Sequence, residues 1–114
     1  MLRTFVHMVL HITAPAAVAR FAFASQWRRA WLIMVATMIV DLDHLLSMPV
    51  FDPDRCSINF HPLHTWPAIL GYLLLTACPK FRIVGVGLLL HMGLDGLDCM
   101  WMQWCRDALA SSKF

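Results

Sequence analysis

Histidine and aspartate recur in short, regularly spaced pairs within otherwise apolar segments. His7 and His11 are four residues apart, and His91 and Asp95 repeat this spacing nearer the other end of the chain. Residues at i and i+4 lie on one face of an α-helix, so each pair presents its polar atoms in one direction. Neutral imidazole and carboxylate are ligands for zinc, manganese and ferrous iron, and imidazole favours zinc. The spacing therefore predicts a divalent metal site, with zinc as the first choice.

A second motif, Asp41-Leu-Asp-His44, ends another apolar segment. Asp41 and His44 are three residues apart and share a face if the segment is an α-helix. Asp43 would then point away from the face that this pair shares. We therefore expect Asp43 either to orient a ligand from behind or to lie beyond a break in the helix.

Two more groups of polar residues complete the set. His61 and His64 are three residues apart just before an apolar stretch, and Asp98 extends the stripe of His91 and Asp95 at i+7. Taken singly, each motif also fits a simpler role, such as a histidine at a membrane interface, a helix cap, a hydrogen bond between helices or a solvated loop. Their common location, derived below, favours metal binding.

The composition indicates what surrounds these residues. Of the 114 residues, 60% are hydrophobic and only 14% are charged, whereas ordinary soluble domains contain about 25% charged residues. Small globules bury only about 60% of the surface of their chain, so a core cannot hide this much apolar surface. A lipid bilayer is the simplest remaining solvent. The net charge of +2 and the lack of basic runs exclude nucleic acid as an expected partner.

Four apolar stretches predict a single transmembrane domain over residues 1–114. The spans are expected at about 5–24, 30–48, 62–78 and 82–104, where roughly 20 residues cross a ~30 Å hydrocarbon layer. The third stretch is short and is therefore extended back to Pro62. A signal peptide is the alternative for the first stretch, but His7 and His11 argue against it. The prediction is an all-α integral membrane protein, a four-helix up-down transmembrane bundle with both termini on one side.

This topology brings the polar motifs together at one membrane surface. The start of the first helix, the end of the second, the start of the third and the end of the fourth all lie on that side, together with all six histidines. The predicted metal ligands are His11, Asp41, His44, His61, His64, His91 and Asp95, with His7 as the weakest candidate. Because they exceed one tetrahedral shell, either two metals bind or half of these residues orient the others.

The chemistry expected of such a cluster is metal-dependent hydrolysis. Two metals about 3.5–4 Å apart suit displacement at phosphorus. A phosphoester in a lipid or lipid-linked substrate is the expected target, with Arg55 as a phosphate clamp and Asp98 or Asp43 as general base. Two alternatives remain open: a metal-ion or proton transporter, and a metal-stabilised membrane scaffold. A homo-oligomer is expected, because four short helices enclose little volume.

The distribution of cations predicts the orientation. The turns between helices one and two and between three and four carry five cations, and the opposite side carries four: Arg20, Arg28, Arg29, Lys80 and Arg82 against Arg3, Arg55, Arg106 and Lys113. The positive-inside rule then places the turns in the cytoplasm and the metal side outside. On that side Cys56 and Cys99 are expected either to form a disulfide or, as a lesser alternative, to supply a thiolate ligand.

Glycines recur through the fourth apolar stretch. They predict close packing between helices and are Gly85, Gly87, Gly93 and Gly96.

Three motifs carry a resemblance to a known family. Asp41-Leu-Asp-His44, Asn59-Phe-His-Pro-Leu-His64 and His91-x-x-x-Asp95, all within apolar helices, resemble the small bacterial inner-membrane proteins described as LexA-regulated, membrane-bound metal-dependent hydrolases. The resemblance covers nearly the whole chain and is greatest for a branch of about this length, particularly from Asp41 to His64. It implies a multi-pass protein of the bacterial inner membrane.

The pair His91-x-x-x-Asp95 is also similar to the ligand pairs of zinc-dependent phospholipase C and related nucleases, which implies phosphoester chemistry. Those enzymes use additional glutamates, and this chain contains none. Aspartate must therefore take any role that glutamate has in them.

Overall fold

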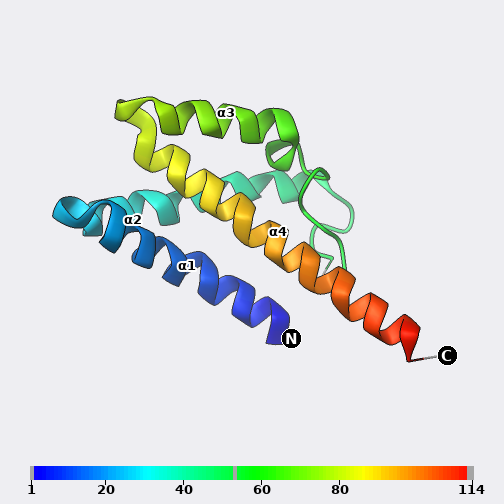
Figure 1. Ribbon diagram of the computed structural model, residues 1–114. Helices are drawn as coiled ribbons and strands as arrows, with labels where there is room; N and C mark the ends of the chain where they lie inside the picture. Colours follow the sequence, from blue (N-terminus) through cyan, green and yellow to red (C-terminus); the bar gives the residue numbers. More distant parts are fainter. Residues whose placement is uncertain (1, 53, 113–114) are drawn as a thin grey trace.

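Four helices account for most of the chain in the computed structural model, which describes residues 2–52 and 54–112. They are α1 (Leu2–Ala22), α2 (Trp27–Ala36), α3 (Trp66–Ala77) and α4 (Arg82–Ser111). No β-strand occurs within the described residues, so the all-helical prediction with four helices is confirmed. The longest helix, α4, contacts each of the other three, and α1 also packs on α2 (Figure 1).

Short 3-10 turns reverse the chain at one end of the molecule. Ala24–Gln26 (η1) joins α1 to α2, and Pro79–Phe81 (η4) joins α3 to α4. Proline has no N–H and cannot continue a helix, which explains why α3 ends before Pro79. The start of α1 and the end of α4 lie toward the opposite end, as do residues 47–52 and 54–61 of the long loop 47–61 (Figure 1). Successive helices therefore alternate in direction, and their polar ends meet.

Two helix boundaries differ most from the predicted ones. The third helix begins at Trp66 rather than at Pro62, because His61 and Thr65 are extended and Pro62–His64 forms a separate 3-10 turn, η3. Pro67 suits the first turn of α3, where a missing N–H leaves no hydrogen bond unmade. At the other end of the chain, α4 continues beyond Trp104 to Ser111.

The second helix changes its winding before it reaches the polar end. After Ala36 it continues as a 3-10 helix, η2 (Thr37–Leu46), in which Thr37, Val40 and Asp43 are buried. A 3-10 helix has three residues per turn, so residues three apart line up on one face. The predicted direction of Asp43 assumed 3.6 residues per turn, whereas the tighter winding lines Asp43 up with Thr37 and Val40 on the buried face.

The apolar core is small and lies in two clusters. Ala19, Ala30 and Met34 pack near the turn between α1 and α2, whereas Val40 and Leu88 belong to a cluster nearer the middle. Many large apolar side chains are exposed instead. By length and composition, two helical segments could cross a membrane: Leu2–Ala22 and Pro79–Ser111.

Close helix packing depends on Gly85 and Gly87. A Cβ atom on Gly85 would lie 2.5 Å from the backbone nitrogen of Thr76, and one on Gly87 would lie 3.0 Å from Cα of Met34. Gly93 and Gly96 would meet nothing within 4 Å. The packing role predicted for these last two glycines is therefore wrong within this chain.

Gly85→Ala is expected to destabilise the fold by about 1–3 kcal/mol, because the backbone of α3 must move away from α4. Thermal unfolding followed by circular dichroism in detergent measures the change. Gly93→Ala is the matched control, and we expect it to be neutral or slightly stabilising, because alanine favours a helix more than glycine does. Equal melting temperatures for the two variants would contradict this account of the α3–α4 contact.

Candidate metal centre

Four of the predicted ligands meet at the polar end of the molecule. Asp41 comes from η2, His64 from η3, and His91 and Asp95 from α4. One ligand atom from each lies within 4.8 Å of the others. His64, His91 and Asp95 are buried, whereas the side chain of Asp41 is partly exposed. We call these four residues the central group.

The distances within the central group suit a shared ion. Oδ1 of Asp41 lies 3.0 Å from Nε2 of His91 and 3.3 Å from Nε2 of His64. Oδ2 of Asp95 lies 3.0 Å from Nε2 of His64 and 3.4 Å from Nε2 of His91. Ligands about 2.0–2.1 Å from a small tetrahedral cation are separated by about 3.3 Å, so these four distances are compatible with a shared metal ion.

The protonation of His64 supports a cation at this position. Nδ1 of His64 lies 3.0 Å from Oδ2 of Asp43, and an ionised carboxylate only accepts hydrogen bonds, so Nδ1 carries the proton. In the neutral ring, Nε2 then presents a lone pair to the oxygens of Asp41 and Asp95. It is buried and has no hydrogen-bond partner among the described residues. Facing lone pairs in a buried site require a positive charge between them, which either a metal ion or a proton on Nε2 supplies.

Asp43 holds His64 in place. Besides Nδ1 of His64, its Oδ2 accepts a hydrogen bond of 2.9 Å from the backbone N–H of Leu63, and its Oδ1 lies 3.1 Å from Nδ1 of His44. Both oxygens are therefore engaged. This geometry assigns Asp43 the first of its two predicted positions, orienting a ligand from behind, and leaves it poorly placed as a general base.

Asp43→Asn is expected to weaken metal binding by about 10–100-fold, as is typical when the partner of a ligating histidine is lost. The amide can donate to Nδ1 of His64 and move the proton to Nε2, which then cannot bind an ion. Competition with a chromophoric chelator measures the affinity. Asp107→Asn, at an exposed position of α4, is the matched control. An unchanged affinity in Asp43→Asn would contradict the assigned role.

His44 and His61 lie outside the central group, although both were predicted ligands. Nδ1 of His44 donates toward the carbonyl of Asp41 at 3.0 Å, and its Nε2 accepts from the hydroxyl of Ser57 at 3.2 Å. The ring of His61 stacks on that of His44, with centroids 3.8 Å apart. Asp43, His44 and His64 are also close enough to share an ion, but their facing atoms are the ones already hydrogen-bonded. Burial, and then the neighbouring His44, lower the pKa of His61, which favours its neutral form.

His7, the weakest sequence candidate, and His11 both reach Asp95 from α1. Nε2 of His7 lies 3.2 Å from Oδ1 of Asp95, and Nε2 of His11 lies 3.4 Å from the same oxygen. The three residues form a second group whose ligand atoms lie within 4.8 Å of one another. The predicted ligand His11 therefore lies beside Asp95 in this second group, and not in the central group with Asp41.

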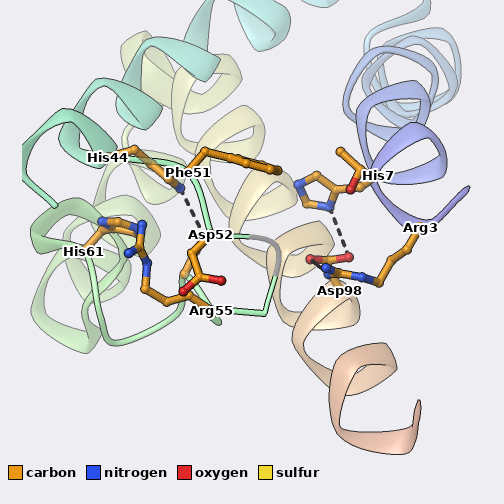
Figure 2. A pocket seen from close by; sticks show the side chains of 10 residues that line it. Arg3, His7, His44, Phe51, Asp52, Arg55, His61 and Asp98 are labelled. Atoms are coloured by element: carbon orange, nitrogen blue, oxygen red, sulfur yellow. Dashed lines mark hydrogen bonds and ion pairs between the residues drawn. The ribbon is translucent and has the colours of Figure 1, made fainter. Parts of the chain in front are cut away.

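A cleft of about 90 Å³ lies beside these residues. Figure 2 shows Arg3, His7 and Asp98 on one wall and His44, Arg55 and His61 on the other. Arg3 was not among the residues predicted for the site. Its position four residues before His7, on the same helix face, was the available signal.

The two cations of the cleft are held differently. Nη1 of Arg3 lies 2.6 Å from Oδ2 of Asp98, an ion pair that joins α1 to α4. Arg55 donates hydrogen bonds to the carbonyls of Pro49 and Val50, at 3.0 and 3.2 Å. Oδ1 of Asp98 is buried and has no hydrogen-bond partner among the described residues.

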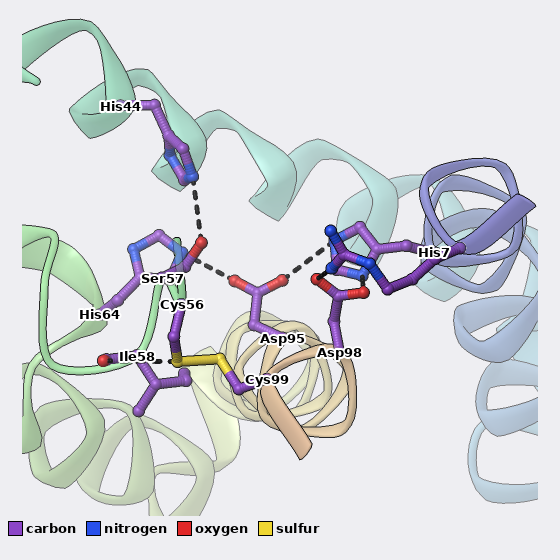
Figure 3. The surroundings of a disulfide bond; sticks show 10 residues. His7, His44, Cys56, Ser57, Ile58, His64, Asp95, Asp98 and Cys99 are labelled. Atoms are coloured by element: carbon purple, nitrogen blue, oxygen red, sulfur yellow. Dashed lines mark hydrogen bonds and ion pairs between the residues drawn. A yellow bond between two sulfur atoms is a disulfide. The ribbon is translucent and has the colours of Figure 1, made fainter. Parts of the chain in front are cut away.

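A disulfide joins Cys56 to Cys99 and ties loop 47–61 to α4 (Figure 3). It resolves the two alternatives for these cysteines, because a disulfide sulfur is not a thiolate ligand. Cys99 lies four residues after Asp95, and Cys56 precedes Ser57, the partner of His44. The cross-link therefore fixes the loop beside the candidate metal centre.

Fold and site together define an all-helical protein whose buried histidines and aspartates could hold a metal ion. The chain belongs to a family of unknown function (DUF6122), whose match spans residues 1–102 and so includes every candidate site residue. No curated protein and no solved structure matches it significantly.

Proposed function

We propose that the protein is a membrane-embedded, metal-dependent hydrolase that acts on a phosphoester of a lipid or lipid-linked substrate. One observation carries the proposal: a buried group of facing histidine and aspartate lone pairs lies beside a cleft that contains two guanidinium groups. A divalent cation held beside this cleft would polarise a phosphoryl oxygen and lower the pKa of a water molecule.

The side chains of the cleft suit a phosphate group. Arg3 and Arg55 supply positive charge from opposite walls, and guanidinium groups bind phosphate oxygens through paired N–H donors. Asp98 orients Arg3 through Oδ2. Its Oδ1 has no hydrogen-bond partner among the described residues and lies 4.0 Å from Nδ1 of His7. We therefore assign the proton of the attacking water to this oxygen, so the general-base role goes to Asp98 rather than to Asp43.

The exposed apolar surface supports the membrane part of the proposal. Phe21, Ile39 and Leu74, from three different helical segments, are each more than two-thirds exposed. Water would make such a surface costly, whereas lipid would cover it. The polar residues gather at the end opposite the cation-rich turns, which suits a site at the outer face of a bacterial inner membrane. The disulfide agrees with an oxidising compartment on that side.

The transport alternative receives less support. A proton or ion path needs polar groups through the full length of the bundle. In the half near the α1–α2 turn, Ala19, Ala30 and Met34 form an apolar cluster instead. We therefore keep hydrolysis as the proposal and use transport as an outcome of its test.

The test uses detergent-purified protein loaded with zinc or manganese and offered phosphomonoesters, phosphodiesters and phospholipids. We expect phosphoester hydrolysis by the wild type and none by His91→Ala. If the metal-loaded wild type leaves every substrate intact, the hydrolase proposal fails. Metal flux into liposomes that is lost in His91→Ala would then favour transport.

Arg55→Gln tests the phosphate clamp separately. Losing one charged hydrogen bond costs about 1.5–3 kcal/mol, so we expect KM for the hydrolysed phosphoester to rise about 10–100-fold. Metal content should stay unchanged, because Arg55 is not a ligand. Steady-state kinetics at saturating metal measure the effect. An unchanged KM would remove Arg55 from the substrate site.

A further inference from the structure

Asp95 is shared between the two groups of candidate ligands. Its Oδ2 faces His64 and His91 of the central group, whereas its Oδ1 faces His7 and His11 on α1. Figure 3 shows interactions leaving both carboxylate oxygens in opposite directions, toward His64 and toward His7. Asp95 is only 4% exposed, so water has little access to form hydrogen bonds with its Oδ1.

The two ring nitrogens of His11 are placed like those of His64: Nδ1 faces a hydrogen-bond acceptor, and Nε2 faces Asp95. Nδ1 of His11 lies 2.8 Å from the backbone carbonyl of His7. A carbonyl oxygen only accepts hydrogen bonds, so Nδ1 carries a proton, and in the neutral ring Nε2 has a lone pair. Nε2 is directed at Oδ1 of Asp95, and it is buried with no hydrogen-bond partner among the described residues.

The same situation therefore exists on both sides of one carboxylate. On each side, a histidine with its Nδ1 proton already engaged turns a buried lone pair toward an oxygen of Asp95. Each side needs a positive charge to offset the repulsion. A carboxylate that gives one oxygen to each of two cations is the usual bridge of two-metal sites, in which the ions lie about 3.5–4 Å apart.

We propose that His7, His11 and Asp95 bind a second divalent cation and that Asp95 bridges it to the ion of the central group. This inference rests on the metal site proposed above, but it does not require that the site hydrolyses anything. The ion would also join α1 to α4 beside the ion pair of Arg3 and Asp98.

The two ions would differ in access. The central group supplies four ligands, which complete a tetrahedral shell, whereas the second group supplies three. Structural zinc sites are closed by four protein ligands, and catalytic sites keep one position open. His7 is 24% exposed and lines the cleft. The open position would therefore belong to the ion on α1, next to Arg3 and Asp98, where a substrate phosphate can approach.

Metal counting on detergent-purified, zinc-saturated and washed protein tests the proposal. We expect two zinc equivalents in the wild type, and one in both His11→Ala and His7→Ala. His61→Asn removes a buried imidazole that lies outside both groups, and this matched control should keep two. Helix content by circular dichroism and elution as a single species establish that each variant is folded.

Each result decides a different question. If the wild type binds one zinc equivalent and His11→Ala also binds one, the second site is overturned. The central group then remains the one metal site of the proposal. No bound metal in the wild type would overturn both sites and leave protons as the balancing charges.

Paramagnetic resonance of the manganese-loaded protein tests the bridge. We expect an exchange-coupled pair in the wild type and an isolated-ion signal in His11→Ala. Two equivalents that give only isolated-ion signals would overturn the role of Asp95 as a bridge.

Discussion

Asp95→Asn is expected to remove both metal ions and reduce phosphoester hydrolysis to background. The substitution keeps the size of the side chain and its place in α4. It replaces a charged bridge by an amide whose NH₂ group faces imidazole lone pairs on one side. Asp95 contacts His7, His11, His64 and His91. The substitution therefore affects both groups of candidate ligands at once. We expect metal affinity to fall by at least about 100-fold, at or beyond the upper end of the losses seen on removing an orienting residue.

Stability provides a second readout for the same variant. A metal that binds only the folded state stabilises it by about 4 kcal/mol at a concentration 1,000 times its dissociation constant. EDTA should therefore lower the melting temperature of the wild type and leave that of Asp95→Asn unchanged. Asp107→Asn should respond to EDTA as the wild type does. An Asp95→Asn variant that keeps its metal, its activity and its response to EDTA would refute the centre described above.

Removal of the Cys56–Cys99 disulfide is expected to have the next largest effect. The bond closes a loop with a sequence separation of 43 residues, and chain entropy for a loop of that size corresponds to about 4 kcal/mol in the unfolded state. Measured losses are usually about 2–4 kcal/mol, and we expect a value in that range. We also expect weaker metal binding, because the freed loop carries Ser57 and leads to His64.

The double substitution Cys56→Ser and Cys99→Ser tests this prediction in denaturant and thermal unfolding. Cys78→Ser with Cys105→Ser is the matched control, since these two cysteines are free. Reductant should reproduce the first double variant and have no effect on it. If reductant changes neither the unfolding transition nor the metal affinity of the wild type, the cross-link does not support the site.

Much of the candidate site could be predicted from the sequence because spacing within a helix is a local property. The i, i+4 spacings place His7 with His11 and His91 with Asp95 whatever surrounds them. Apolar stretches of alternating direction then bring those pairs to the same end as Asp41 and His64. Helix number and the common location of the polar motifs follow from these two facts alone.

The tertiary structure decided which polar atoms face one another. The 3-10 winding of η2 turns Asp43 inward to hold His64, whereas His44 turns to Ser57 and His61 stacks on it. Sequence spacing fixes the faces of one element. It does not fix how far that element is rotated against its neighbours, because the rotation depends on contacts such as Gly87 against Met34. For this reason the sequence by itself determined a polar cluster of histidine and aspartate, and only the packing of four helices placed Asp95 between two groups of ligands.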